Sequence, residues 1–142
     1  MQTTGAGRLD LIVPENELYG HSGSDSSDYI HVQTNGDTMN PAAQRLYRAR
    51  KACMQMLSIR GYNIEKVELE MSAQGFKEKF NLGAHDVPDR VILTACVEAD
   101  VDNRIFVFFS DDPTVDAKAI RFYIHRMTHE SVTRAILVVQ EG

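Results

Sequence analysis

The sequence lacks the features that would mark a membrane or secreted protein. No apolar run approaches the roughly 20 residues that cross a bilayer, and residues 1–7 have neither a basic start nor an apolar stretch. Only two cysteines are present, Cys53 and Cys96, and both lie within apolar runs. We therefore expect two buried thiols in a reducing compartment, rather than a disulfide or a metal-binding pair.

The usual catalytic signatures are also missing. The isolated Gly5-Ala6-Gly7 does not make a phosphate-binding loop, no serine lies in a nucleophile elbow, and neither cysteine has an electropositive setting. The sequence therefore predicts no catalytic residue and no cofactor.

Two patterns resemble metal sites only superficially. His125 and His129 have the spacing of paired zinc ligands on a helix. However, no glutamate follows His125, and Lys118 and Arg121 add positive charge to the same face. The acids at 98, 100 and 102 lack the oxygen spacing and glycine of a calcium loop. We expect no metal site.

The charge is distributed unevenly along the 142 residues. The net charge of −5 resides in residues 1–40, which hold six acids and one base, whereas residues 41–142 are neutral overall. Residues 1–40 are also rich in Gly, Ser, Asp and Asn, which predicts a polar, acidic and mostly flexible N-terminal extension, with a short extended piece at 9–13. Residues 41–142 are predicted to form one globular domain.

A helix is predicted over residues 41–60. Asn40 is a good cap, Pro41 suits the first position, and Gly61 ends the helix. The predicted core stripe is Ala42, Leu46, Ala49, Cys53, Met56 and Leu57. The helix carries five bases and no acid, so its polar face is either simply solvated or a basic surface for a partner. The candidates for that surface are Arg45, Arg48 and Lys51.

The rest of the chain alternates short helices and apolar runs. Helical turns are expected at 65–69 and 73–80, the second capped by Ser72, followed by a loop at 81–90. Nearly continuous apolar runs at 91–97, 105–109 and 135–139 predict strands buried on both faces.

The connections between these runs predict the sheet. The short acidic link at 98–103 favours an antiparallel hairpin. A helix at about 115–130 before the third run favours a parallel pair. The core stripe of that helix is Ile120, Tyr123, Ile124 and Met127. The predicted fold class is α/β, a small mixed β-sheet flanked by helices.

Several motifs occur in an order that resembles one family. They are Arg45-Leu46-Tyr47-Arg48-Ala49-Arg50-Lys51 with Arg60-Gly61-Tyr62, then Val67-Glu68-Leu69 and Phe76-Lys77, then Phe106-Val107-Phe108-Phe109 with Asp112-Pro113, and finally the helix end at 123–127 and the strand at 133–140. Residues 44–142 thus resemble the N-terminal jaw domain of the subunit-5 family of eukaryotic DNA-directed RNA polymerases, shared by polymerases I, II and III.

The resemblance implies a restriction-endonuclease-like fold that is catalytically inert, because residues 105–109 lack the acid and lysine of an active nuclease. It implies a non-catalytic structural subunit in the nucleus, in the lower jaw beside downstream duplex DNA. The implied partners are the largest polymerase subunit, other polymerase subunits, that DNA, and transcription regulators. The family's C-terminal assembly domain has no counterpart in these residues.

The resemblance also implies a DNA-proximal segment, formed by Pro113, Thr114, Val115, Lys118 and Arg121. Any contact there would be to phosphates and independent of sequence. Asp116 stands where the family usually has glycine, and a carboxylate at this place would repel phosphate.

Three alternatives stay open at this point. The chain could be a paralogue restricted to one polymerase class, a nuclease-like enzyme with a displaced site, or a stand-alone adaptor that binds proteins through residues 41–60.

Overall fold

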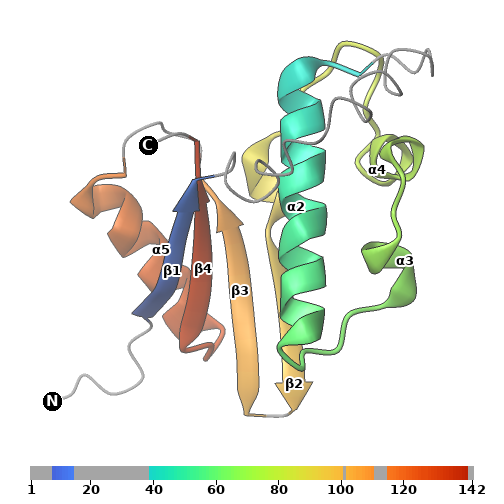
Figure 1. Ribbon diagram of the computed structural model, residues 1–142. Helices are drawn as coiled ribbons and strands as arrows, with labels where there is room; N and C mark the ends of the chain where they lie inside the picture. The colour runs from blue at the N-terminus through green and yellow to red at the C-terminus, as the bar shows by residue number, and fades with distance from the viewer. Residues whose placement is uncertain (1–7, 15–38, 101, 111–114, 141–142) are drawn as a thin grey trace, which may run out of the picture.

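The computed structural model describes residues 8–14, 39–100, 102–110 and 115–140. They form a four-stranded mixed sheet with helices on both faces (Figure 1). The strands are β1 (Arg8–Pro14), β2 (Ala95–Asp100), β3 (Asn103–Phe109) and β4 (Arg134–Val139). The helices are α2 (Pro41–Ile59), α3 (Lys66–Leu69), α4 (Ala73–Lys79), the short 3₁₀ helix η3 (Arg90–Leu93) and α5 (Ala117–His129). The predicted α/β class is confirmed. None of the described helices has the length and apolar character required to span a membrane.

The strand order is β1-β4-β3-β2. Strands β2 and β3 pair antiparallel as a hairpin, and β3 pairs parallel with β4 across the crossover through α5, so both predicted pairings are confirmed. The hairpin is tighter than expected, because Asp100 already pairs with Asn103.

Strand β1 pairs parallel with β4 at the opposite edge from β2. It is the short extended piece expected at 9–13, and it makes a segment before residue 41 part of the sheet. The prediction of a flexible extension otherwise falls on residues 1–7 and 15–38, which lie outside the described residues, and the boundary at residue 41 stays a prediction.

The two inner strands are buried on both faces. Ile105, Val107 and Phe109 of β3 pack toward α2, whereas Phe106 and Phe108 pack toward α5. Strand β4 alternates in the same way between the two cores. The expectation of doubly buried strands is therefore confirmed for β3 and β4.

Helix α2 begins and ends as its sequence predicts. The side-chain oxygen of Asn40 accepts a hydrogen bond from the N–H of Ala42 at 2.8 Å. Gly61 follows the helix with a φ of 99°, and the N–H of Tyr62 donates to the carbonyl of Leu57 at 2.9 Å.

The core stripe of α2 differs from the prediction at two places. Ala42 and Met56 are only partly buried, and Ala43 and Met54 are buried instead. Helices α3 and α4 pack against α2, and Ser72 caps α4 by accepting from the N–H of Gly75, as predicted (Figure 1).

The strand predicted at 91–97 is wrong over its first half. Residues 90–93 form η3, with Asp89 accepting from the N–H of Val91 at 3.1 Å, and β2 begins only at Ala95. Strand β2 lies at a sheet edge and alternates between partly buried and exposed residues, so it is not buried on both faces. Cys96 is consequently exposed, contrary to the prediction, whereas Cys53 is buried as expected.

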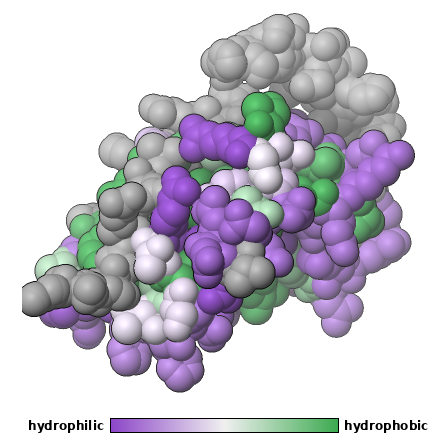
Figure 2. Space-filling view, turned by 90° about the horizontal axis from the view of Figure 1, so that it is seen from below, coloured by the Kyte–Doolittle hydropathy of each residue, from purple (hydrophilic) through white to green (hydrophobic). Residues whose placement is uncertain are grey.

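The end of the molecule that carries the β2–β3 turn is mostly hydrophilic. Figure 2 looks at this end from below, and the hydrophobic residues seen there form small, separate patches. Scattered apolar side chains of this kind are normal for a protein surface and mark no site by themselves.

Arg50 is the main departure from the predicted basic face of α2. It is only 7% exposed. Its Nη1 donates to Oε1 of Glu68 at 2.6 Å, and its Nε donates to the carbonyl of Leu93 at 3.4 Å. The guanidinium also lies 5.3 Å from the ring centroid of Phe80. One side chain thus joins α2 to α3, to η3 and to the end of α4.

The charge of Glu68 is stabilised by this pairing. Burial alone raises the pKa of Glu68. The hydrogen bond and charge of Arg50, together with the charge of Lys79, lower this pKa by more than burial raises it, so the net shift is downward. The pairing therefore stabilises the fold above the unfolded-state pKa and is lost as the pH falls through the lower folded-state pKa.

We expect Glu68→Ala to lower the free energy of unfolding by about 2–3 kcal/mol, because it leaves the Arg50 guanidinium buried without its partner. The double variant Arg50→Met/Glu68→Leu should lose less, since it leaves no unpaired charge. Urea denaturation at neutral and acidic pH measures both, and the deficit of Glu68→Ala should shrink in acid. Equal losses in the single and double variants would contradict this account.

Candidate functional site

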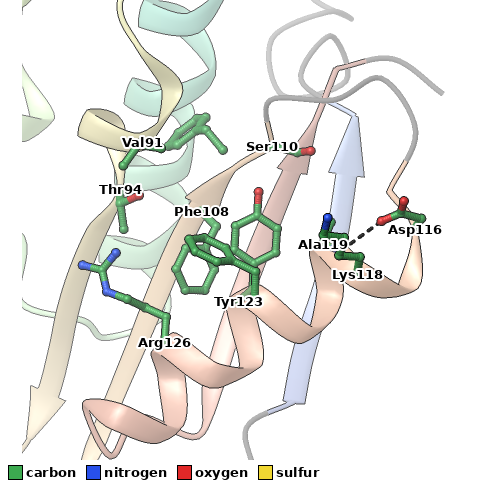
Figure 3. Close-up of a pocket in the computed structure, with 11 residues that line it drawn as sticks. Val91, Thr94, Phe108, Ser110, Asp116, Lys118, Ala119, Tyr123 and Arg126 are labelled. Carbon is green, nitrogen blue, oxygen red and sulfur yellow. Dashed lines mark hydrogen bonds between the residues drawn. The ribbon is translucent and has the colours of Figure 1, made fainter.

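Helix α5 is anchored on one face of the sheet. Its inner residues Tyr123 and Met127 are buried, and Ile120 and Ile124 are partly buried against the same core, which confirms the predicted stripe. The helix begins after Asp116, whose Oδ1 accepts a hydrogen bond from the N–H of Ala119 at 2.9 Å (Figure 3). The Asp116 carboxylate thus has a structural task at the positive end of the helix.

The outward side of α5 is basic. Lys118, Arg121 and His125 are exposed, and the helix carries no acid between Ala117 and His129. Arg126 is partly buried, with its guanidinium 5.4 Å from the ring centroid of Phe106. This surface has the charge that attracts phosphates or acidic side chains.

A cleft of about 490 Å³ lies between α5 and the segment that leads from η3 into β2. Phe108 and Tyr123 lie at its base, with Val91 and Thr94 on one wall and residues of α5 on the other (Figure 3). Tyr123 belongs to α5, and the other lining residues from this helix are Lys118, Ala119, Phe122 and Arg126.

The sequence did not predict this cleft. Its two walls are far apart in the chain, and the sequence pattern predicts that Val91 belongs to a buried strand. The signal that could have found the α5 wall is the spacing of Lys118, Phe122 and Arg126, which places a large apolar residue between two cations on one helix face.

The predicted DNA-proximal residues are placed only in part. Pro113 and Thr114 lie outside the described residues. Val115 packs partly buried against the core beneath α5, whereas Lys118 and Arg121 are exposed in the first turns of the helix. Contact of these residues with DNA stays a prediction.

The predicted basic surface on α2 is a separate region. Arg45 is exposed, whereas Arg48 and Lys51 are partly buried, and the Nζ of Lys51 lies 3.5 Å from the Oη of Tyr47. Helix α2 covers one face of the sheet and α5 the other (Figure 1). The two basic regions therefore cannot form one continuous site, and a partner for the α2 region stays a prediction.

The described residues contain no group of three or more His, Cys, Asp or Glu side chains arranged to hold a metal ion. His125 and His129 are both exposed on α5. Burial raises the pKa of the Cys53 thiol to about 12, although the charge of Arg50 lowers it slightly. This thiol is therefore protonated at neutral pH and a poor nucleophile.

Two replacements of Asp116 distinguish its role as a helix cap from the effect of its charge. Asp116→Ala should lower the free energy of unfolding by about 1 kcal/mol, because the N–H of Ala119 loses its acceptor. Asp116→Ser is the matched control, since a serine hydroxyl can still cap the helix without a charge, and it should be close to the parent protein. Thermal and urea unfolding measure both. An alanine variant as stable as the serine variant would contradict the capping role.

Comparisons with known proteins now bear on this geometry. Residues 40–127, which run from the cap of α2 into α5, match the family described as RNA polymerase Rpb5, N-terminal domain.

Three relatives illustrate the match. The chain is 37% identical over 101 residues to "DNA-directed RNA polymerases I, II, and III subunit RPABC1" of Caenorhabditis briggsae, covering 69% of this chain and 48% of that protein. It is 36% identical over 99 residues to "DNA-directed RNA polymerases I, II, and III subunit rpabc1" of Dictyostelium discoideum, covering 69% and 45%. It is 30% identical over 124 residues to "DNA-directed RNA polymerases IV and V subunit 5B" of Arabidopsis thaliana, covering 87% and 50%.

The chain spans about half the length of the curated relatives it matches. The family match nonetheless covers more than half of the chain itself, and it includes α2, the hairpin and most of α5. Together with the relatives above, this confirms the resemblance seen in the motifs: the chain belongs to the RNA polymerase Rpb5 N-terminal domain family.

Proposed function

We propose that the chain is part of a non-catalytic structural subunit of a nuclear DNA-directed RNA polymerase, and that it forms part of the lower jaw beside downstream DNA during transcription. The observation that carries this proposal is the family membership over residues 40–127. The relatives named above are all called subunits of RNA polymerases. The family match includes the helices on both faces of the sheet, so both surfaces are available to such an assembly.

The proposal includes the absence of an active site of its own. A mixed sheet between helices is compatible with a restriction-endonuclease-like layout. A nuclease of that kind needs carboxylates and a lysine on its central hairpin to hold a metal and activate water. Strand β3 has the sequence NRIFVFF and contains neither an acid nor a lysine, and its last five residues are buried. This composition supports a structural role.

DNA contact through α5 is part of the proposal. Lys118 and Arg121 are exposed near the start of the helix, and neither forms a salt bridge with any residue that the structure describes. Each cation that meets a phosphate releases counterions, so binding of this kind is independent of sequence and sensitive to salt. The carboxylate of Asp116 lies beside these cations and opposes phosphate binding, although its hydrogen bond to Ala119 directs it toward the helix end.

Protein partners would use other surfaces. We assign the largest polymerase subunit as the main partner, along with other polymerase subunits. The basic α2 region of Arg45, Arg48 and Lys51 lies on the face opposite α5, so a protein bound there would leave α5 facing the DNA.

Co-purification tests membership in a polymerase. A tagged full-length protein, isolated from cells that express it naturally, should bring down the largest polymerase subunits in amounts comparable to its own, identified by mass spectrometry. The same tag on an unrelated nuclear protein is the control. Isolation without any large polymerase subunit would overturn the proposal and favour the stand-alone adaptor.

Duplex DNA binding tests the α5 surface. Lys118→Glu/Arg121→Glu should weaken the binding of a labelled duplex by about tenfold at low salt and flatten its salt dependence, because two phosphate contacts become repulsive. Asp116→Ser should strengthen binding. Arg60→Glu/Lys66→Glu, the same charge change at two exposed residues outside α5, is the control and should have a smaller effect. Fluorescence anisotropy measures all four proteins, and equal weakening by Arg60→Glu/Lys66→Glu would contradict a local contact at α5.

A paralogue restricted to particular polymerases is the second candidate. The observation that favours it is the 30% identity over 87% of the chain to the Arabidopsis protein named for polymerases IV and V. The identity of the co-purified largest subunit distinguishes a shared subunit from a restricted one. A metal-dependent cleavage assay on DNA tests the nuclease alternative, for which the proposal expects no activity.

A further inference from the structure

The cleft beside α5 exposes large apolar side chains on both of its walls. Phe122 on α5 is 58% exposed, and Val91 on the facing wall is 50% exposed. Ile92, next to Val91, is 49% exposed. A partner that covered these three side chains would remove their exposed apolar surface from water, which favours binding.

Charge surrounds the apolar centre of the α5 wall. Lys118, Phe122 and Arg126 are four residues apart, so they form one stripe along the helix, and all three line the cleft. Among the described residues that line the cleft, the one carboxylate is that of Asp116, and it already accepts the hydrogen bond of the helix cap. The wall therefore presents one aromatic ring between two cations.

The size of the cleft fits a few side chains. Its volume of about 490 Å³ falls within the range of small ligand sites, roughly 300–1,000 Å³. Phe108 and Tyr123 at its base form an aromatic floor, with ring centroids 4.7 Å apart and the two rings tilted by 36° to each other. A ring or branched aliphatic group inserted here would contact aromatic carbon below and apolar walls on both sides.

We propose that this cleft binds a short acidic segment of a partner protein, which inserts one large apolar side chain between Val91 and Phe122. Carboxylates on either side of that anchor pair with Lys118 and Arg126. The charge pattern of the stripe selects acidic flanks, and the apolar walls select the anchor. The proposal concerns the domain itself and does not depend on its assembly into a polymerase.

A peptide fits the cleft better than a nucleic acid strand. A strand carries one charge per nucleotide and binds along a continuous cationic groove with stacking rings. Among the described lining residues, cations lie only at the two ends of the α5 wall, Asp116 adds a carboxylate, and the facing wall has the uncharged Val91 and Thr94. Nucleic acid binding is therefore an alternative that the experiment must separate.

The test uses the 142-residue chain and a short fluorescein-labelled synthetic peptide, in which a central Leu-Phe pair is flanked by Asp and Glu. We expect binding with a Kd of about 100 µM or tighter at low salt. Phe122→Ser and Lys118→Glu should each weaken it about tenfold. Arg121→Glu is the matched control: it makes the same kind of charge change on the same helix but outside the cleft lining, and it should change the Kd by less than about threefold.

Two further probes define the chemistry that is recognised. A peptide with Gln and Asn in place of its acids, and one with Ser in place of Leu-Phe, should both bind about tenfold more weakly. Amide shifts in NMR spectra of the isotope-labelled chain should change around Val91, Thr94 and Phe122 when the acidic peptide is added. Circular dichroism confirms that each variant is folded.

Several results would overturn the proposal. They are an absence of peptide binding up to about 1 mM, an equal loss with Arg121→Glu and Lys118→Glu, or amide shifts centred on α2. Tighter binding of a labelled single-stranded oligonucleotide than of the acidic peptide would assign the cleft to nucleic acid instead.

Discussion

Strands β3 and β4 have no face that can be left to water. Residues 105–109 and 135–139 are buried throughout, and their side chains alternate between two separate cores. A helix must therefore cover each side of the sheet, which is the task of α2 on one face and α5 on the other. The order of elements along the chain follows from this requirement, since a parallel β3–β4 pair needs a crossover and the crossover supplies α5.

The same requirement determines where function can reside. Residues 105–109 and 135–139 of the two inner strands are all apolar, so these buried positions carry no ionisable side chain. The remaining surfaces are the outer sides of the helices and the sheet edges. The surface of helix α5 has three stripes of residues. One stripe faces the core and one lines the cleft, and the third, which includes Arg121 and His125, faces solvent. A thirteen-residue helix can thus support the fold and present two distinct polar surfaces.

The sequence predicts those parts of the fold that depend on neighbouring residues. Five consecutive apolar residues bounded by turns favour an inner strand, and Asn40 with Pro41 favours a helix start. The apolar run at 91–97 has the same pattern, but the strand prediction is wrong for its first half. Asp89 caps a 3₁₀ turn there, and Arg50 donates a hydrogen bond to the carbonyl of Leu93. The burial of Arg50 was beyond prediction for the same reason, since its partners lie in segments far along the chain. The ends of the helices were only partly predictable. Gly61 is a recognisable stop after α2, but Asn81 and Ser131 also adopt a positive φ, of 59°, after α4 and α5 without being glycine.

Asp116 shows why a candidate site needs both kinds of information. The sequence alone places a carboxylate close to Lys118 and Arg121, and on that basis Asp116 is expected to repel phosphate. The structure adds that this carboxylate accepts the N–H of Ala119 at the positive end of the α5 dipole, so part of its charge is already balanced within the helix. Its backbone φ of −102° requires no glycine, so an aspartate here costs no strain and supplies a cap. The carboxylate therefore gives a firmer start to the helix that carries both the exposed cations and one wall of the cleft.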